Sequence, residues 1–175
     1  YFQKDVASML AGFFDLIRAR LNSKSALALN LILATPPALL LGAFLHFVGL
    51  DEALRSPLII AITTIVFGVL LWLSDIWGKR EKKTEDLTWK GAIMLGLAQS
   101  IALIPGTSRS GITMTAARAM GMTRVESARF SMLMSIPIIA VSGLFSIVKL
   151  AGTPAEGGAS LSHGLIVAVL SFITA

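Results

Sequence analysis

Long apolar runs separated by short basic segments dominate this sequence. Two of the runs, Pro57 to Trp77 and Phe130 to Leu150, are 21 residues long, which corresponds to about 30 Å of α-helix and to the hydrocarbon core of a bilayer. A soluble chain of 175 residues does not need two runs of that length. The pattern therefore predicts an all-α integral membrane protein, a polytopic helical bundle.

Two shorter patterns precede these runs. Residues 1–25 carry apolar side chains at helical spacing among four Lys and Arg residues, which predicts an amphipathic helix at the membrane surface. Residues 26–50 form a third apolar run, broken by Pro36 and Pro37. Proline removes a backbone donor, so we expect this span to kink there.

Composition agrees with the membrane prediction. Apolar residues make up 55% of the chain and charged residues 14%, against roughly 45–50% and 25% in soluble domains. The net charge of +5 would suggest nucleic acid if the basic residues formed a stripe with aromatic side chains. They cluster between apolar runs instead, as topology signals do. Because there is no cysteine, disulfides and thiolate metal sites are excluded.

The distribution of basic residues predicts the topology. Lys and Arg number four in residues 1–25, one in the link before Pro57, and five in residues 78–90. The positive-inside rule places the first and last of these segments in the cytoplasm. Arg118, Arg124 and Arg129 indicate a further return to that side. Asp75 is expected to pair with Lys79, four residues on.

The segment from Gly91 to Ile104 is apolar but has only 14 residues, about 21 Å of helix. It is too short to cross alone and stops at Pro105. A second short segment, Gly111 to Met120, follows a polar cluster and leads back to basic residues. We therefore expect a re-entrant hairpin whose tip lies inside the membrane.

The expected organisation is a single membrane domain over residues 1–175. The chain lacks an initiator Met, and its last apolar run is about 12 residues, too short to span. We therefore expect the middle of a longer protein. The predicted parts are a cytoplasmic amphipathic helix (1–25), spans (26–50, 57–77 and 130–150), a cytoplasmic basic loop (78–90), the re-entrant hairpin (91–121), a periplasmic loop (151–163) and the start of another span (164–175).

Candidate chemistry concentrates at the hairpin tip, in "IPGTSRSGIT", residues 104–113. Gly106 permits a tight reversal, and the helix that starts near Ser108 has unpaired N–H groups that attract anions. Arg109 adds a permanent charge and a fork of donors suited to phosphate. An arginine near the bilayer centre costs about 2.5–3.5 kcal/mol even on the lenient insertion scale, which favours a functional role.

Other interpretations of the tip remain open. Arg109 could extend to the interface or pair with a carboxylate from another helix, while the hydroxyls only cap the half-helix. An anion site at a broken helix also suits a transporter or scramblase of an anionic lipid or phosphate. A third interpretation is a purely structural membrane subunit. The residues alone indicate an anion site and do not choose among these functions.

Residues 96–137, "GLAQSIALIPGTSRSGITMTAARAMGMTRVESARFSMLMSIP", closely resemble the undecaprenyl-diphosphatase family associated with bacitracin resistance. In particular, "PGTSRSGIT" is similar to the PGxSRSxxT signature of that family. The resemblance implies a multi-pass bacterial inner-membrane enzyme that removes the terminal phosphate of undecaprenyl diphosphate. This reaction recycles the lipid carrier for peptidoglycan synthesis. The implied fold has inverted repeats, with two re-entrant hairpins at a site that faces the periplasm.

The resemblance also implies roles for individual residues. Arg109 aligns with the arginine that binds the diphosphate, and Ser108 with a serine proposed as nucleophile or phosphate ligand. These two are the expected catalytic residues. The expected substrate-binding residues are Gly106, Thr107, Ser110, Thr113 and Gln99.

The glutamate-pair motif expected in the first half of this family is absent. Glu81 and Glu85 have a related spacing but lie in the Lys-rich loop, where they are interpreted as solvated charges. We therefore expect these 175 residues alone to be inactive. No metal ligand is assigned here, and a divalent cation (Mg²⁺ or Ca²⁺), if used, would be held by the preceding half. The expected partners are the polyprenyl diphosphate and membrane lipids, with no nucleic acid and with a homodimer left open.

Overall fold

The computed structural model describes residues 2–49, 56–78, 81–152 and 161–174. Within these ranges the regular structure is helical, apart from an isolated parallel bridge between Lys82 and Met122. The chain forms two compact units, Tyr1–Pro137 and Ile138–Ala175. The candidate site lies in the first unit.

Three helical stretches are long and apolar enough to cross a membrane: Ser23–Val48, Pro57–Trp77 and Arg124–Val148. The prediction of an all-helical chain with several candidate spans is thereby confirmed. Helix α5 (Pro57–Trp77) has the same bounds as the predicted apolar run. Proline at its first position fits a helix start, and Gly78 follows its last residue with extended backbone.

The N-terminal segment contains a shorter helix than expected. Helix α1 (Gln3–Ile17) ends well before residue 25, and α2 (Ser23–Ala34) begins soon after it. Asn22 starts the new helix because its Oδ1 accepts from the N–H groups of Lys24 and Ser25, both at 2.9 Å. The N–H of Asn22 donates in return to Ser25 Oγ at 2.7 Å, which completes a capping box.

The expected break at the proline pair divides the first span into two helices. Helix α3 (Pro36–Val48) follows α2 after the single residue Thr35. The hydroxyl of Thr35 donates to Leu31 O at 2.7 Å. Both α2 and α3 pack against α6 (Trp89–Ile101). The approach of α2 is close, since a Cβ on Gly96 would lie 2.4 Å from Ala34 O.

The buried core of the first unit joins α1, α2, α6, α7 (Arg109–Ala119) and the start of α8 (Arg124–Gly152). Its largest fully buried apolar side chains are Phe130, Leu31, Leu95, Met122, Leu133 and Met134. Helix α5, in contrast, buries none of its residues fully, and its Leu58 and Ile65 are more than two-thirds exposed. Such an apolar surface requires a non-aqueous environment or further protein to cover it.

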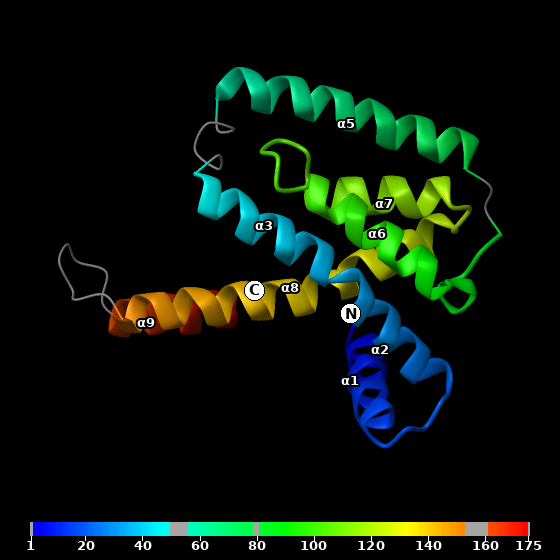
Figure 1. Ribbon diagram of the computed structural model, residues 1–175, viewed down its shortest axis with the longest axis horizontal. Coiled ribbons are helices and arrows are strands. Elements are labelled where there is room, and N and C mark those ends of the chain that lie inside the picture. The colour runs from blue at the N-terminus through cyan, green and yellow to red at the C-terminus, as the bar shows by residue number, and fades with distance from the viewer. Residues whose placement is uncertain (1, 50–55, 79–80, 153–160, 175) are drawn as a thin grey trace. The chain divides into compact units, whose positions relative to one another are not determined.

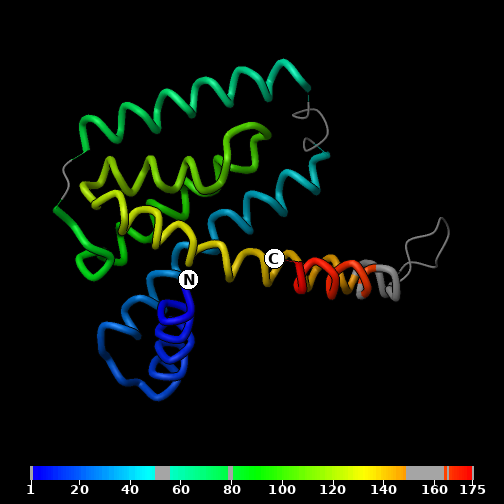
Figure 2. The backbone as a smooth tube through the Cα atoms, turned by 180° about the vertical axis from the view of Figure 1, so that it is seen from behind, coloured from blue at the N-terminus to red at the C-terminus, as the bar shows by residue number. Residues whose placement is uncertain are grey.

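Helices α6 and α7 form a hairpin, and α5 lies alongside it, as Figure 1 and Figure 2 both show. The start of α7 lies near Thr63 and Thr64 of α5, and its end lies near Asp75. Helices α5 and α7 therefore run in the same direction. The short helix η1 (Thr84–Asp86) lies in the segment that links α5 to the hairpin.

Polar contacts connect this linking segment and α1 to the start of α8. Glu126 accepts hydrogen bonds from Thr84, at 2.5 Å from the hydroxyl and 3.1 Å from the N–H. Arg129 forms ion pairs with Asp5 of α1 and, at 3.5 Å, with Glu126. Arg129, expected as a topology signal, therefore also has a structural role. In the second unit, α8 continues to Gly152 and is followed by α9 (Leu161–Thr174).

Candidate active site

The turn between α6 and α7 contains the polar cluster singled out in the sequence. Helix α6 ends at Ile101 and not at the expected Ile104. The N–H groups of residues 102–104 each bond to the carbonyl three residues earlier, at 3.0 to 3.2 Å, so the chain tightens before Pro105. Helix α7 then begins at Arg109, with Ser108 as its capping residue, in agreement with the expected half-helix.

Helix α5 holds the tip of this turn. Thr63 Oγ1 donates to Pro105 O at 2.6 Å, and Thr64 Oγ1 donates to Gly106 O at 3.1 Å. Gly106 has φ +89°, and a Cβ there would lie 2.3 Å from Thr63 Oγ1 and 2.5 Å from Ile60 O. Only glycine fits this combination of backbone conformation and close approach. The turn is therefore fixed against α5 at defined points.

Ser108 has a strained backbone and an exposed side chain. Its φ of 62° and ψ of 113° are unusual for a residue with a Cβ, and such strain gathers at functional sites. Its Oγ accepts from Gly111 N at 3.3 Å and lies 3.4 Å from Ser110 Oγ. The hydroxyl thus lies at the N-terminal end of α7, where the helix dipole favours negative charge.

Several buried polar atoms around the turn have no hydrogen-bond partner among the described residues. They are Arg109 Nη1, Thr107 Oγ1 and both amide atoms of Gln99. Thr107 and Gln99 are each only 2% exposed, and unpaired buried polar groups are costly. These groups can be satisfied by a polar ligand or by a segment outside the described residues. Together with the N-terminus of α7 they make the turn chemically suited to an anion.

Thr113 has a different environment. It is 2% exposed, and its Oγ1 donates to Arg109 O at 2.9 Å and lies 2.6 Å from Ser131 Oγ. A longer contact joins it to Ser110 O at 3.2 Å. In this geometry Thr113 connects the first turn of α7 to α8 through the carbonyl of Arg109 and the hydroxyl of Ser131.

Three residues in these contacts were missed by sequence reasoning: Thr63, Thr64 and Ser131. The available signal was a pair of hydroxyl residues within the apolar run of α5. That signal is ambiguous because Thr in a membrane helix often bonds to its own backbone, and both Thr side chains also do so here.

The described residues contain no group of three or more His, Cys, Asp or Glu side chains placed to bind a metal ion. No ion pair within the described ranges involves Arg109. The charge that Arg109 brings to the turn is therefore not neutralised by a carboxylate in this part of the chain. The turn therefore carries a positive charge, and the described residues place no carboxylate next to it to act as a base.

Replacing Ser108 with glycine is expected to separate stability from activity. Glycine adopts a positive φ without strain, but it lacks the hydroxyl that caps α7, and that loss costs little. The net effect should be a free energy of unfolding higher by about 0.5–1 kcal/mol. Phosphate release, the activity proposed below, should fall by about 100-fold or more because the hydroxyl at the start of α7 is removed. Thermal unfolding and phosphate release of the full-length protein measure the two effects.

Ala19 provides the matched control because it also has a positive φ, 53°, in the link between α1 and α2. Ala19→Gly should give a similar gain in stability with unchanged activity. A Ser108→Gly variant with full activity would contradict the importance of the hydroxyl.

Taken together, the fold and the turn define a helical, multi-pass membrane protein with an arginine and several hydroxyl groups at the tip of a helical hairpin. Residues 1–175 match the family described as bacitracin resistance protein BacA. The chain belongs to this family, which confirms the resemblance in its sequence.

Curated relatives agree with this assignment. The chain is 48% identical over 178 residues to an undecaprenyl-diphosphatase from Maricaulis maris, covering 100% of this chain and 66% of the relative. It is 49% identical over 185 residues to one from Hyphomonas neptunium, covering 99% and 65%. A relative from Ruegeria pomeroyi is 48% identical over 176 residues, covering 100% and 65%. The chain thus spans about 65% of the length of these relatives.

Proposed function

We propose that the protein containing this chain is an undecaprenyl-diphosphatase. The observation that carries the proposal is the turn itself, where the strained Ser108 presents an exposed hydroxyl beside Arg109 at the N-terminus of α7. The names of the relatives supply the substrate. The reaction would recycle the lipid carrier for peptidoglycan synthesis and confer bacitracin resistance.

In the proposed reaction, a water oxygen forms a bond to the terminal phosphorus, and the bond from that phosphorus to the bridging oxygen breaks. The products are undecaprenyl phosphate and inorganic phosphate. Arg109 and the N–H groups at the start of α7 would stabilise the charge on the phosphate oxygens. Ser108 could hold a phosphate oxygen during this attack. In the alternative, Ser108 Oγ attacks first and displaces undecaprenyl phosphate, and the water then releases phosphate from the phosphoserine; a trapped phosphoserine distinguishes the two.

The other site residues have supporting roles in this proposal. Thr107, Ser110 and Gln99 would contact the phosphates or the residues that face them, since Thr107 and Gln99 have unsatisfied buried atoms. Gly106 would let the backbone approach the ligand. Thr113, which is bonded within the protein, would act mainly by positioning Arg109.

We further propose that α6 and α7 form a re-entrant hairpin in the bacterial inner membrane. Thr63 lies six residues inside α5, so the tip ends about 9 Å short of the Pro57 end of that helix and about 21 Å from the Trp77 end. A hairpin tip at this depth of an apolar helix supports the proposal. Irregular backbone is tolerated there when protein or a water-filled cavity surrounds it.

The expected topology follows from this placement. Residues 1–25 and 78–90 would lie in the cytoplasm, the spans would be 26–50, 57–77 and 130–150, and residues 151–163 would be periplasmic. The hairpin would enter from the cytoplasmic side with its tip accessible from the periplasm. Residues 1, 50, 79–80 and 153–160 of this scheme lie outside the described residues.

The full-length protein should release inorganic phosphate from undecaprenyl diphosphate, whereas the 175-residue chain alone should not. The reason is that phosphoryl transfer needs an activating base or metal ligand as well as charge neutralisation, and the turn lacks a neighbouring carboxylate in the described part of the chain. Phosphate release by both purified proteins in detergent measures this.

Transport is the alternative that this assay separates. Flux of an anionic lipid across vesicles without hydrolysis by the full-length protein would contradict the proposed enzyme. Detectable phosphate release by the 175-residue chain would instead contradict the claim that a second part of the protein is required.

A further inference from the structure

A second polar cluster lies at the opposite end of α5 from the hairpin tip. A cavity of about 410 Å³ is lined there by α5, α7 and the start of α8. Its volume lies within the range of about 300–1,000 Å³ typical of small-ligand sites. It is distinct from the turn, because Asp75 is twelve residues beyond Thr63 on α5, a distance of about 18 Å along the helix.

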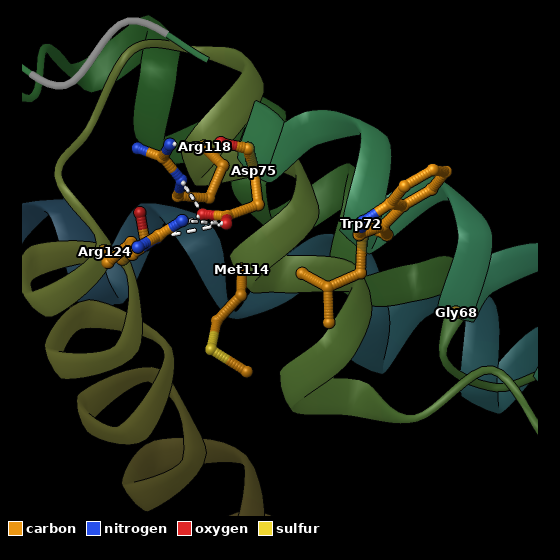
Figure 3. A pocket seen from close by; sticks show the side chains of 8 residues that line it. Gly68, Trp72, Asp75, Met114, Arg118 and Arg124 are labelled. Atoms are coloured by element: carbon orange, nitrogen blue, oxygen red, sulfur yellow. Dashed lines mark hydrogen bonds and ion pairs between the residues drawn. The ribbon is translucent and has the colours of Figure 1, made fainter. Parts of the chain in front are cut away.

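Three charged side chains form the polar end of this cavity, and Figure 3 shows the Asp75 carboxylate between the guanidinium groups of Arg118 and Arg124. Arg118 Nε donates to Asp75 Oδ1 at 3.1 Å, and Arg124 Nε donates to the same atom at 2.7 Å. Among the described residues, two arginines therefore face one carboxylate. Asp75 is thus bonded to distant arginines, whereas the expected partner Lys79 lies outside the described residues.

The two arginines differ in what they can offer to a ligand. The Arg118 side chain is 3% exposed and also donates to the carbonyl groups of Met122, Asp75 and Gly78. The Arg124 side chain is 61% exposed, and its ion pair with Asp75 uses Nε and Nη2. Arg124 Nη1 is not part of that pair. Arg124 is therefore the residue suited to contact an anion.

Ser127 supplies a second, independent indication of a ligand. It lines the cavity one helical turn after Arg124, it is 1% exposed, and its Oγ has no hydrogen-bond partner among the described residues. Buried hydroxyls are normally satisfied, so this one indicates a polar group that enters the cavity. Glu126, the acid in the same turn, bonds to Thr84 and Arg129.

The rest of the cavity lining is apolar, from Gly68, Leu71 and Trp72 of α5 and Met114 of α7. A ligand that fits both ends must therefore be amphipathic. Asp75 lies two residues before the end of α5 at Trp77, and a basic segment follows. Trp and Lys or Arg at a helix end mark the level of lipid headgroups, and anionic lipids attract such basic segments.

We propose that this cavity binds an anionic phospholipid, with the phosphate at Arg124 and Ser127 and the hydrocarbon along Gly68, Leu71 and Trp72. The site is separate from the hairpin turn and does not depend on the proposed activity. Filling the apolar part should weaken binding. Gly68→Leu does this without a clash at Cβ, because a Cβ there meets no atom within 4 Å.

The test measures lipid binding to the full-length protein in detergent, by thermal stabilisation and by native mass spectrometry with added phosphatidylglycerol or phosphatidylcholine. We expect one tightly bound phosphatidylglycerol, with affinity lowered about tenfold or more in Gly68→Leu and in Ser127→Ala. Ser127→Ala removes an unpartnered hydroxyl, so it should fold normally. Gly143→Leu is the matched control, because Gly143 of α8 also has open space at Cβ.

Three results would overturn the proposal. The first is equal binding of phosphatidylglycerol to Gly68→Leu and to the unmodified protein. The second is equal binding of phosphatidylcholine, which would remove the role of charge. The third is full stabilisation by glycerol 3-phosphate alone, which would show a site for a free phosphate ester and not for a lipid.

Discussion

Replacing Arg109 with alanine in the full-length protein is expected to reduce phosphate release from undecaprenyl diphosphate by about 1,000-fold. The guanidinium group is the charge at the start of α7, and its Nη1 has no hydrogen-bond partner among the described residues. Its removal therefore breaks no bond of that atom within this part of the protein, and thermal stability should change little. Phosphate release and thermal unfolding, measured on the same preparation, check both expectations.

Two further variants sharpen this test. Arg109→Lys keeps the positive charge but loses the planar fork of donors, so we expect activity between that of the alanine variant and that of the unmodified protein. Arg20→Ala removes an exposed arginine in the link between α1 and α2 and should leave activity unchanged. Full activity of Arg109→Ala would favour a structural role for the arginine.

Helix positions were predictable where they depend on length and apolar composition. The bounds of α5 match the apolar run because Pro57 starts the helix and Gly78 follows its end. The break before Pro36 was predictable for a similar reason, since proline cannot continue the hydrogen-bond ladder. These features depend on adjacent residues, which the sequence shows directly.

Helix ends that depend on side-chain capping were predicted less well. The first helix ends at Ile17 because Asn22 and Ser25 form the cap of a new helix. A periodic apolar pattern continues across this cap, so the period alone suggested one longer helix. Helix α6 ends before Pro105 because the hydrogen bonds of the next three residues follow the tighter 3₁₀ pattern, in which each N–H bonds to the carbonyl three residues earlier.

The composition of the candidate site was predictable, but its supports were not. Gly106, Ser108 and Arg109 lie within four consecutive residues of the chain, and their types predict an anion site without any knowledge of the fold. Thr63 contacts the turn across 42 residues, and Ser131 contacts Thr113 across 18. Such contacts depend on how the helices pack.

The ion pairs of Asp75 illustrate the same limit. A local pair with Lys79 was the natural expectation from helical spacing. Lys79 lies outside the described residues, so this pair stays a prediction. Among the described residues the carboxylate bonds to Arg118 and Arg124, which are 43 and 49 residues away. Arg118 and Arg124, which were predicted to be topology signals, thus also connect α5 to α7 and α8 through Asp75.

Replacing Gly106 with alanine is expected to disrupt the hairpin turn and abolish activity. The new Cβ would lie 2.3 Å from Thr63 Oγ1 and 2.5 Å from Ile60 O, at a φ of +89°. The positive φ alone costs about 1–2 kcal/mol, and the contact with the Ile60 backbone forces the turn away from α5. Both the melting temperature and phosphate release of the full-length protein should therefore fall.

A double variant separates the causes of this loss. The double variant carries Gly106→Ala and Thr63→Ala. It removes the Thr63 hydroxyl that the new Cβ would contact, but the positive φ and the contact with Ile60 O remain. We therefore expect at most partial recovery of stability. Gly143→Ala is the control, since a Cβ there meets no atom within 4 Å, and it should gain about 0.5–1 kcal/mol from helix propensity. Full recovery in the double variant would mean that the Thr63 side chain alone, and not the backbone of α5, requires glycine at the tip.

The position of Arg109 depends on the same contacts. Pro105 O and Gly106 O accept hydrogen bonds from α5, so a turn displaced from that helix would carry Arg109 with it. We therefore expect Gly106→Ala to abolish phosphate release even at temperatures where the variant is still folded.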